Sequence, residues 1–91
     1  MRYRFVIEDE VLDEFMHLSA RRREQVFRHF QRIADDAPLP GDEDFEDSAG
    51  RWIMRRDFNS WIVWFWYDSP VHEVRIVDFQ PQPARRQKLS Q

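Results

Sequence analysis

Seven consecutive apolar residues, Trp61–Tyr67, constrain the fold of this chain more than any other feature of its sequence. The run is far too short to span a membrane, and its aromatic and β-branched residues favour a β-strand. Successive side chains of a strand point to opposite faces, which divides the run into Trp61, Val63, Phe65 and Tyr67 on one face and Ile62, Trp64 and Trp66 on the other. Both faces are apolar, and we therefore expect both to be covered.

Three further segments alternate between apolar and polar residues and predict strands at residues 2–7, 51–58 and 72–79. Asn59-Ser60 predicts a tight hairpin turn before the apolar run, and Asp68-Ser69-Pro70 predicts a turn after it.

Between the first two strands the period changes to that of a helix. Asp9 is the expected N-cap of a short helix that carries Val11, Phe15 and Leu18 on one stripe. Ser19 is the expected N-cap of a second helix, whose apolar stripe consists of Val26, Phe27, Phe30, Ile33 and Ala34. The order β-α-α-β-β-β predicts an α+β fold of two layers, with a helical hairpin packed on one face of a small, mostly antiparallel sheet.

The chain of 91 residues has room for one domain, which we expect over residues 1–83, with a frayed polar tail over 84–91. The absence of cysteine excludes disulfides, thiolate metal sites and cysteine nucleophiles. The start of the chain lacks an apolar segment of signal-peptide length, so we expect a cytoplasmic protein that does not enter a membrane.

The charge of the chain is unevenly distributed. The net charge of −3 divides into −6 over residues 1–50 and +3 over residues 51–91, which speaks against a general nucleic-acid coat. Residues 35–47 contain seven acidic groups and no basic group, and with Pro38, Pro40 and Gly41 among them they predict an exposed loop. A metal site or a dock for an arginine-rich partner are the alternative readings of this segment.

Arginines of the predicted strands are the candidate catalytic residues. RNA cleavage needs a cation for the phosphate, for which Arg55, Arg56 and Arg75 are the candidates, and a base, for which the candidates are Asp57, Glu73 and Asp78. The alternative is that these same residues form ion pairs across strands. His17, His29 and His72 are widely spaced and read as surface or boundary residues, so we expect no metal and no cofactor.

Ile62, Trp64 and Trp66 are the candidate partner-binding residues. The two predicted helices can cover only one face of the strand, and the tail offers only Leu89 as a large apolar side chain. We therefore expect a partner protein, or a second copy of this chain as a homodimer, to cover these three residues.

The three consecutive arginines at the start of the second predicted helix, Arg21-Arg22-Arg23, could bind phosphate, or could form ion pairs with Asp13 or Glu14 on the preceding helix.

The order of elements resembles the RelE/ParE superfamily of bacterial type II toxins over residues 2–80. The features that carry the resemblance are the strand Tyr3–Ile7, the acidic helix start at residues 8–15, Arg32-Ile33-Ala34-Asp35, Gly50–Arg55 and Glu73–Phe79. The resemblance implies a RelE-like fold whose third strand lies between the second and the fourth. It also implies a toxin neutralised by an antitoxin protein, which acts either by cutting mRNA on the ribosome or by poisoning DNA gyrase.

The sequence departs from the superfamily at the positions that carry catalysis. RNA-cutting relatives usually read Arg-x-Gly-x-Tyr-Arg at the hairpin, where this chain has Asp57 and Ile62 at the two arginine positions. The basic residue that follows the last strand of these relatives is replaced by Gln80-Pro81-Gln82. An endoribonuclease with an altered site and a non-catalytic protein that acts only by association therefore both stay open.

Overall fold

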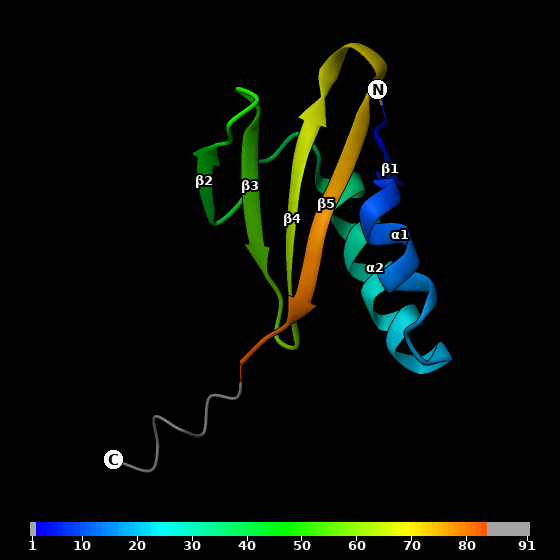
Figure 1. The fold of residues 1–91 in the computed structure, drawn as a ribbon. Coiled ribbons are helices and arrows are strands. Elements are labelled where there is room, and N and C mark those ends of the chain that lie inside the picture. The colour runs from blue at the N-terminus through cyan, green and yellow to red at the C-terminus, as the bar shows by residue number, and fades with distance from the viewer. Residues whose placement is uncertain (1, 84–91) are drawn as a thin grey trace.

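A five-stranded sheet and a helical hairpin form two layers in the computed structural model, which describes residues 2–83 (Figure 1). The strands are β1 (Arg4–Ile7), β2 (Glu43–Glu46), β3 (Trp52–Asp57), β4 (Trp61–Asp68) and β5 (Glu73–Pro81). The helices are α1 (Asp9–Met16) and α2 (Ala20–Asp36), and a single 3₁₀ turn, Ser69–Val71, connects β4 to β5. The predicted α+β architecture is confirmed, whereas the predicted tail over residues 84–91 lies outside the described residues.

The strands follow the order β1-β5-β4-β3-β2, and β1 pairs with β5 in parallel while the other neighbours are antiparallel. The apolar strand β4 is therefore central, between β3 and β5, as the resemblance implied. Trp64 lies opposite Arg55 on one side and Asp78 on the other. A bulge between Trp64 and Phe65 shifts the register with β5.

Strand β2 corrects the prediction of a loop over residues 35–47. Glu43–Glu46 pairs with β3 although all four of its residues are exposed. Contacts with β3 hold this acidic segment: Glu43 forms an ion pair with Arg55 at 2.9 Å, and a carboxylate oxygen of Asp42 accepts a hydrogen bond from the backbone N–H of Asp57 at 2.7 Å. The pairing offsets a local composition that disfavours a strand.

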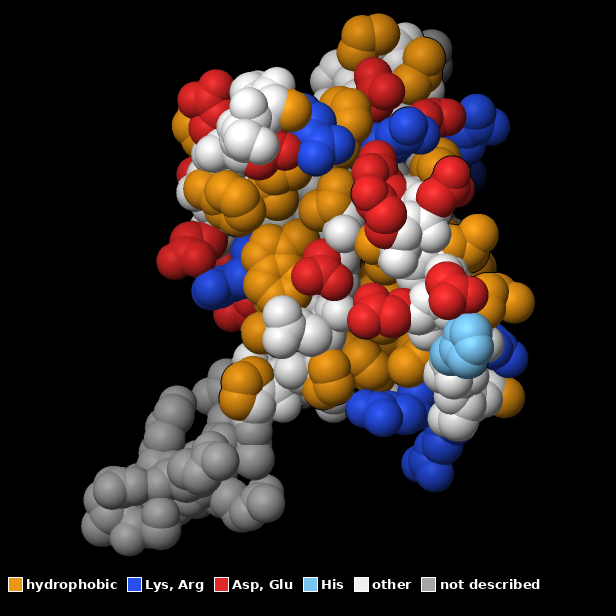
Figure 2. All heavy atoms as spheres, viewed as in Figure 1, with side chains coloured by type: hydrophobic (Ala, Val, Ile, Leu, Met, Phe, Trp, Pro, Cys, Tyr) orange, Lys and Arg blue, Asp and Glu red, His pale blue; other side chains and the backbone are white. Residues whose placement is uncertain are grey.

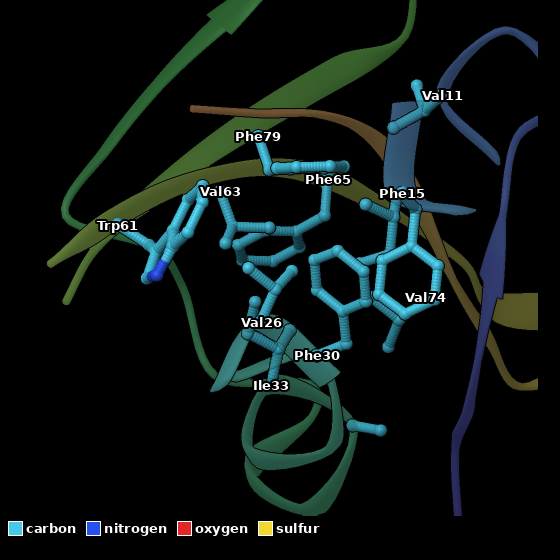
Figure 3. Close-up of a cluster of buried hydrophobic side chains, with 12 residues drawn as sticks. Val11, Phe15, Val26, Phe30, Ile33, Trp61, Val63, Phe65, Val74 and Phe79 are labelled. Atoms are coloured by element: carbon cyan, nitrogen blue, oxygen red, sulfur yellow. The ribbon is translucent and has the colours of Figure 1, made fainter. Parts of the chain in front are cut away.

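The hydrophobic core lies between α2 and the sheet (Figure 3). The helices contribute Val11, Phe15, Val26, Phe30, Ile33 and Ala34, and the strands contribute Trp61, Val63, Phe65, Val74, Ile76 and Phe79. Both predicted stripes are confirmed except at two residues. Leu18 lies beyond the end of α1, and Phe27 is 47% exposed and packs its ring edge-on against Phe5. The face of β4 that carries Trp61, Val63 and Phe65 is therefore covered within the chain.

Two expected details of the helix ends are wrong. Asp9 is the first residue of α1 rather than its cap, and Glu8 occupies the cap position without a side-chain hydrogen bond to the helix. Arg23 donates hydrogen bonds to the carbonyl oxygens of Met16 and Leu18, and Arg22 lies 5.0 Å from the ring centre of Trp61. Arg23 therefore closes the turn between the helices and Arg22 lies over a ring of β4, and neither pairs with the acidic residues of α1. The expected cap at Ser19 is confirmed, because its hydroxyl accepts a hydrogen bond from the N–H of Arg22 at 3.3 Å.

Candidate functional site

The candidate site is the face of the sheet that the helices leave uncovered, which we call the open face (Figure 2). Successive side chains of a strand point to opposite faces, so the strand residues that lie next to a core residue in the chain point to the open face. Its apolar members are Val6, Phe45, Ile53, Ile62, Trp64, Trp66 and Val77. Its charged members, including two from the adjoining loops, are Glu8, Glu43, Arg51, Arg55, Asp57, Glu73, Arg75 and Asp78.

The three predicted partner-binding residues lie side by side along β4 on the open face. Ile62, Trp64 and Trp66 are half-buried by their neighbours in the sheet and retain exposed surface. Figure 2 shows hydrophobic side chains gathered over β3 and β4, with acidic side chains beside them. The structure describes no segment of residues 2–83 that lies over these three residues as α2 lies over the opposite face.

A hollow of about 270 Å³ opens next to Trp64 on the open face. Its apolar walls are Phe45, Ile53, Trp64 and Val77, and its charged lining is Asp47, Arg51 and Asp78. Phe45 is 49% exposed at the outer edge, whereas Ile53 is only 4% exposed and forms part of the floor. The hollow is thus an apolar notch with carboxylates at its rim, large enough for one or two side chains.

The arginines of the open face are already engaged by carboxylates. Arg51 contacts Asp47 at 2.8 Å and Glu8 at 3.9 Å, and its guanidinium lies 5.5 Å from the ring centre of Trp66. Arg75 contacts Glu73 at 3.3 Å and Glu8 at 3.5 Å. Glu8 therefore bridges two arginines that come from different parts of the sheet.

The predicted catalytic arginines do not come together. Arg55 lies on the open face and contacts Glu43 at 2.9 Å and Asp57 at 3.0 Å. Arg56 points to the opposite side, where it contacts Asp36 of α2 at 2.8 Å. Arg55 and Arg75 share the open face but are separated by β4, with Trp64 next to Arg55 and Trp66 next to Arg75. The three arginines form ion pairs, as the alternative expects, but the pairs Arg55–Asp57 and Arg75–Glu73 each lie within one strand and Arg56 pairs with α2, so only part of the pairing runs across strands.

Two carboxyl groups that contact arginines, those of Asp36 and Asp47, have lowered pKa values. A hydrogen bond from Arg56, followed by one from Arg32, lowers the pKa of the Asp36 carboxyl group. Hydrogen bonds from the backbone N–H and side chain of Arg51 likewise lower the pKa of Asp47. A carboxylate that acts as a general base near neutral pH needs a shift in the other direction.

The three histidines lie apart from one another and from the open-face arginines. His17 follows α1 and His29 stacks on Phe58 with ring centres 4.0 Å apart, where burial lowers the pKa of its imidazole. His72 connects the 3₁₀ turn to β5 in the left-handed region, with φ at 53°. Within residues 2–83, no three histidine or acidic side chains are grouped as a metal site would require, and no helix is long and apolar enough to cross a membrane.

A larger hollow of about 610 Å³ lies beside β1, away from the open face. Its lining residues are Arg2, Tyr3, Arg4, Phe5, Gln31, Asp35, Val71 and His72. Arg4 forms an ion pair with Glu73 at 3.0 Å, and Asp35 accepts a hydrogen bond from Gln31 at 3.1 Å. The hollow therefore combines opposite charges that are partly paired, and nothing in it assembles a nucleophile with a base.

Sequence reasoning did not single out the remaining members of the open face, which are Val6, Glu8, Glu43, Phe45, Arg51, Ile53 and Val77. Alternation was sufficient to place Ile53 on the same face as Arg55 along β3, and Val77 on the same face as Arg75 along β5. No local signal could place Phe45, because it reaches the face only through the pairing of β2 with β3.

Comparison of the sequence with models of known protein families finds no match. Comparison with curated proteins also finds none. The structure is similar to a chain of the archaeal RelE–RelB complex from Pyrococcus horikoshii OT3, with a TM-score of 0.64 and 18% sequence identity over 91% of this chain and 98% of that chain. The chain therefore has the RelE-like α+β fold.

Proposed function

We propose that this chain is the toxin of a toxin–antitoxin pair, an inhibitor of growth that a second protein neutralises. The observation that carries the proposal is the RelE-like fold, which extends over 91% of the chain and matches a chain of a RelE–RelB complex. RelE in that structure is bound to RelB, and we extend the same kind of partnership to this chain.

The open face supports a protein partner for this chain. Ile62, Trp64 and Trp66 form a row on the central strand, and Phe45 extends the apolar surface to the sheet edge. Tryptophan is enriched among the residues that dominate protein interfaces, because it buries a large rigid surface at a small entropic cost. We propose that the antitoxin covers this row, and that Trp64 and Trp66 are its main anchors.

The charges of the open face favour inhibition through protein contact over RNA cleavage. Arg55 and Arg75 each contact two carboxylates, so a phosphate would have to displace a partner that is already in place. Inhibition through contact with a protein of the translation machinery or with DNA gyrase does not require phosphate to displace these carboxylates. Ribosome-dependent mRNA cleavage is the second candidate, favoured by the placement of both arginines beside indole rings that could stack on bases.

Induction of the chain in growing cells tests the proposal. We expect growth arrest, with incorporation of labelled methionine lost first if the target is translation and labelled thymidine lost first if the target is gyrase. Co-expression of the neighbouring open reading frame should restore growth. Unimpaired growth of cells that accumulate the soluble, folded chain would contradict the proposed toxin function.

Arginine variants separate the two modes of inhibition. If RNA is cleaved, the R55A/R75A double variant should lose about 100- to 1,000-fold in rate, because a cation that stabilises the transition state is worth roughly 2.7–4 kcal/mol. R56A is the matched control, because Arg56 points away from the open face. If inhibition works through protein contact, the double variant and the control should arrest growth with similar efficiency.

Substitution of Trp64 tests the partner surface. Truncation of a buried tryptophan anchor costs about 2–4 kcal/mol, so W64A should weaken the complex by roughly 30-fold or more while the fold is preserved. Titration calorimetry with the neighbouring gene product measures this loss. W52A is the control, because Trp52 is 59% exposed and lies outside the open face. If W64A and W52A bind the neighbouring gene product with equal affinity, the open face is not part of the interface.

A further inference from the structure

The outer surface of the helical hairpin carries opposite charges on its two helices. Helix α1 contains four exposed acidic residues and no basic residue; the four are Asp9, Glu10, Asp13 and Glu14. The first half of α2, residues 20–28, contains four arginines and one glutamate, which gives a net charge of +3. The two helices pack side by side against the sheet (Figure 1), so an acidic stripe lies next to a basic stripe.

The two stripes do not neutralise each other within the molecule. Within residues 2–83, the carboxylates of α1 form no ion pair with an arginine, and Asp13 contacts only His17, at 3.7 Å. Arg21 likewise has no carboxylate partner in this part of the chain, and Arg23 donates to two backbone carbonyl oxygens. The one ion pair of the basic stripe is internal to it, between Arg28 and Glu24 at 3.2 Å. Charges of both signs are therefore available to a second molecule.

An apolar seam runs between the two stripes. Leu12 and Met16 lie one helical turn apart on the same side of α1 and are 41% and 57% exposed, and Phe27 of α2 is 47% exposed. A hollow of about 370 Å³ opens between the helices, and its lining residues are Phe15, Met16, Ala20, Arg23, Glu24 and Phe27. Large apolar side chains that are grouped on a surface and flanked by charges are typical of an interaction site.

The pattern of this surface is complementary to itself. A two-fold axis that runs along the seam, in the plane of the interface, places α1 of each copy against α2 of the other copy. The acidic stripe then meets the basic stripe twice, and the apolar seam meets its own counterpart. A partner whose contact surface has a single sign of charge would match one stripe and repel the other, so the charges favour a second copy of this chain.

The ends of the helices determine which charges meet. Asp13 lies three residues before the end of α1, and Arg21 is the second residue of α2, so both lie near the turn that connects the helices. A rotation about an axis parallel to the helices preserves the height of each residue along them. Asp13 of one copy is therefore level with Arg21 of the other, and the reciprocal pair is formed by the same symmetry.

We propose that this chain forms a two-fold dimer through the outer surface of α1 and the first half of α2. Met16 of each copy packs against the hollow of the other, and Asp13 of each copy pairs with Arg21 of the other. The contact surface is small, so we expect a dissociation constant on the order of 10 µM. The dimer is independent of the proposed function and leaves the open face accessible, because the helices cover the opposite face of the sheet.

Two charge reversals that each disrupt the dimer should restore it when the two variants are mixed. In D13R and in R21E each molecule repels its own copy at both symmetric contacts, so dimerisation should weaken at least about tenfold. In an equimolar mixture, a heterodimer joins opposite charges at both contacts and should form with about wild-type affinity. Both substitutions suit their helices, because they place a cation in the last turn of α1 and an anion in the first turn of α2. Sedimentation velocity over a range of concentrations measures all four samples.

Variants on and off the seam complete the test. M16E should weaken the dimer by about 30-fold or more without loss of helical circular dichroism, because Met16 is exposed in the single chain. E14R is the matched control for D13R: it changes the charge equally, but Glu14 lies about 200° around α1 from both Leu12 and Met16. E14R should dimerise like the wild type.

Four results would overturn the proposal. They are a wild-type chain that stays monomeric at millimolar concentration, a dimer that D13R and R21E leave intact, a mixture of these two variants that stays monomeric, and a dimer that is lost in W64A but kept in M16E. The last result would place the contact between copies on the open face.

Discussion

At the scale of single residues, Glu8 connects parts of the chain that are far apart in sequence. Its carboxylate lies 3.9 Å from Arg51, which precedes β3, and 3.5 Å from Arg75 on β5. The side chain is only 19% exposed, so the two contacts are less screened than those of a fully exposed pair. This also explains why Glu8 does not cap α1: its carboxylate is turned towards the sheet instead of the helix N-terminus.

Asp36 predicts a pH dependence of stability. Hydrogen bonds from Arg56 and Arg32 lower its pKa in the folded state below the ordinary value of 3.8, so its contribution is present above that value and is lost as pH falls through the folded-state pKa. D36N should lower the free energy of unfolding at pH 7 by about 1 kcal/mol, and the difference from wild type should vanish in stronger acid. Urea unfolding at pH 7 and at about pH 2 measures both values.

The neighbouring carboxylate provides the control for this prediction. Asp35 is exposed and, within residues 2–83, accepts a side-chain hydrogen bond only from Gln31, so D35N should change stability little at either pH. A D36N variant that is destabilised equally at both pH values would show that the loss comes from helix packing and not from the charge of Asp36.

At the scale of elements, most of the fold follows from periodicity, and the exceptions have tertiary causes. Alternation and helical stripes predicted four strands and two helices, because each of these elements buries one face in the core. Glu43–Glu46 buries no residue, so its sequence carries no strand pattern, and only the pairing with β3 holds it in place. Alternation also separates Arg55 from Arg56, whereas their partners Glu43 and Asp36 come from elements whose placement the sequence does not encode locally.

Two phenylalanines of α2 test how the helix is held on the sheet. Phe30 is fully buried among the rings of Phe5, Phe15 and Phe79, so F30A should destabilise the domain by about 3–5 kcal/mol. F27A, on the same helix, should cost only about 1 kcal/mol, because Phe27 is 47% exposed and makes one edge contact with Phe5. Thermal and urea unfolding of the two variants measure this contrast. Equal losses would mean that the exposed side of α2 contributes as much as the core.

At the scale of the whole molecule, the two faces of the sheet are used differently. The helices bury Trp61, Val63 and Phe65 on one face, while the other face keeps Trp64 and Trp66 half-buried among paired charges. A domain of this size cannot cover both faces of a five-stranded sheet with two helices, so an apolar row is left on the surface. The proposed partner acts on this remaining surface.

The charge of the whole molecule predicts weak binding to free RNA. The net charge is −3, and the arginines Arg51, Arg55 and Arg75 are each engaged by carboxylates, so few cations are available to release counterions from a phosphate backbone. We expect a dissociation constant no tighter than about 10⁻⁴ M for random RNA at physiological salt, measured by fluorescence anisotropy. The residual contact should come from residues 51–91, whose net charge is +3, and should fall further in the R85Q/R86Q/K88Q variant. Micromolar affinity for RNA in the variant would mean that the arginines of the open face readily exchange their carboxylate partners for phosphate. RNA cleavage would then be favoured over protein contact as the mode of inhibition.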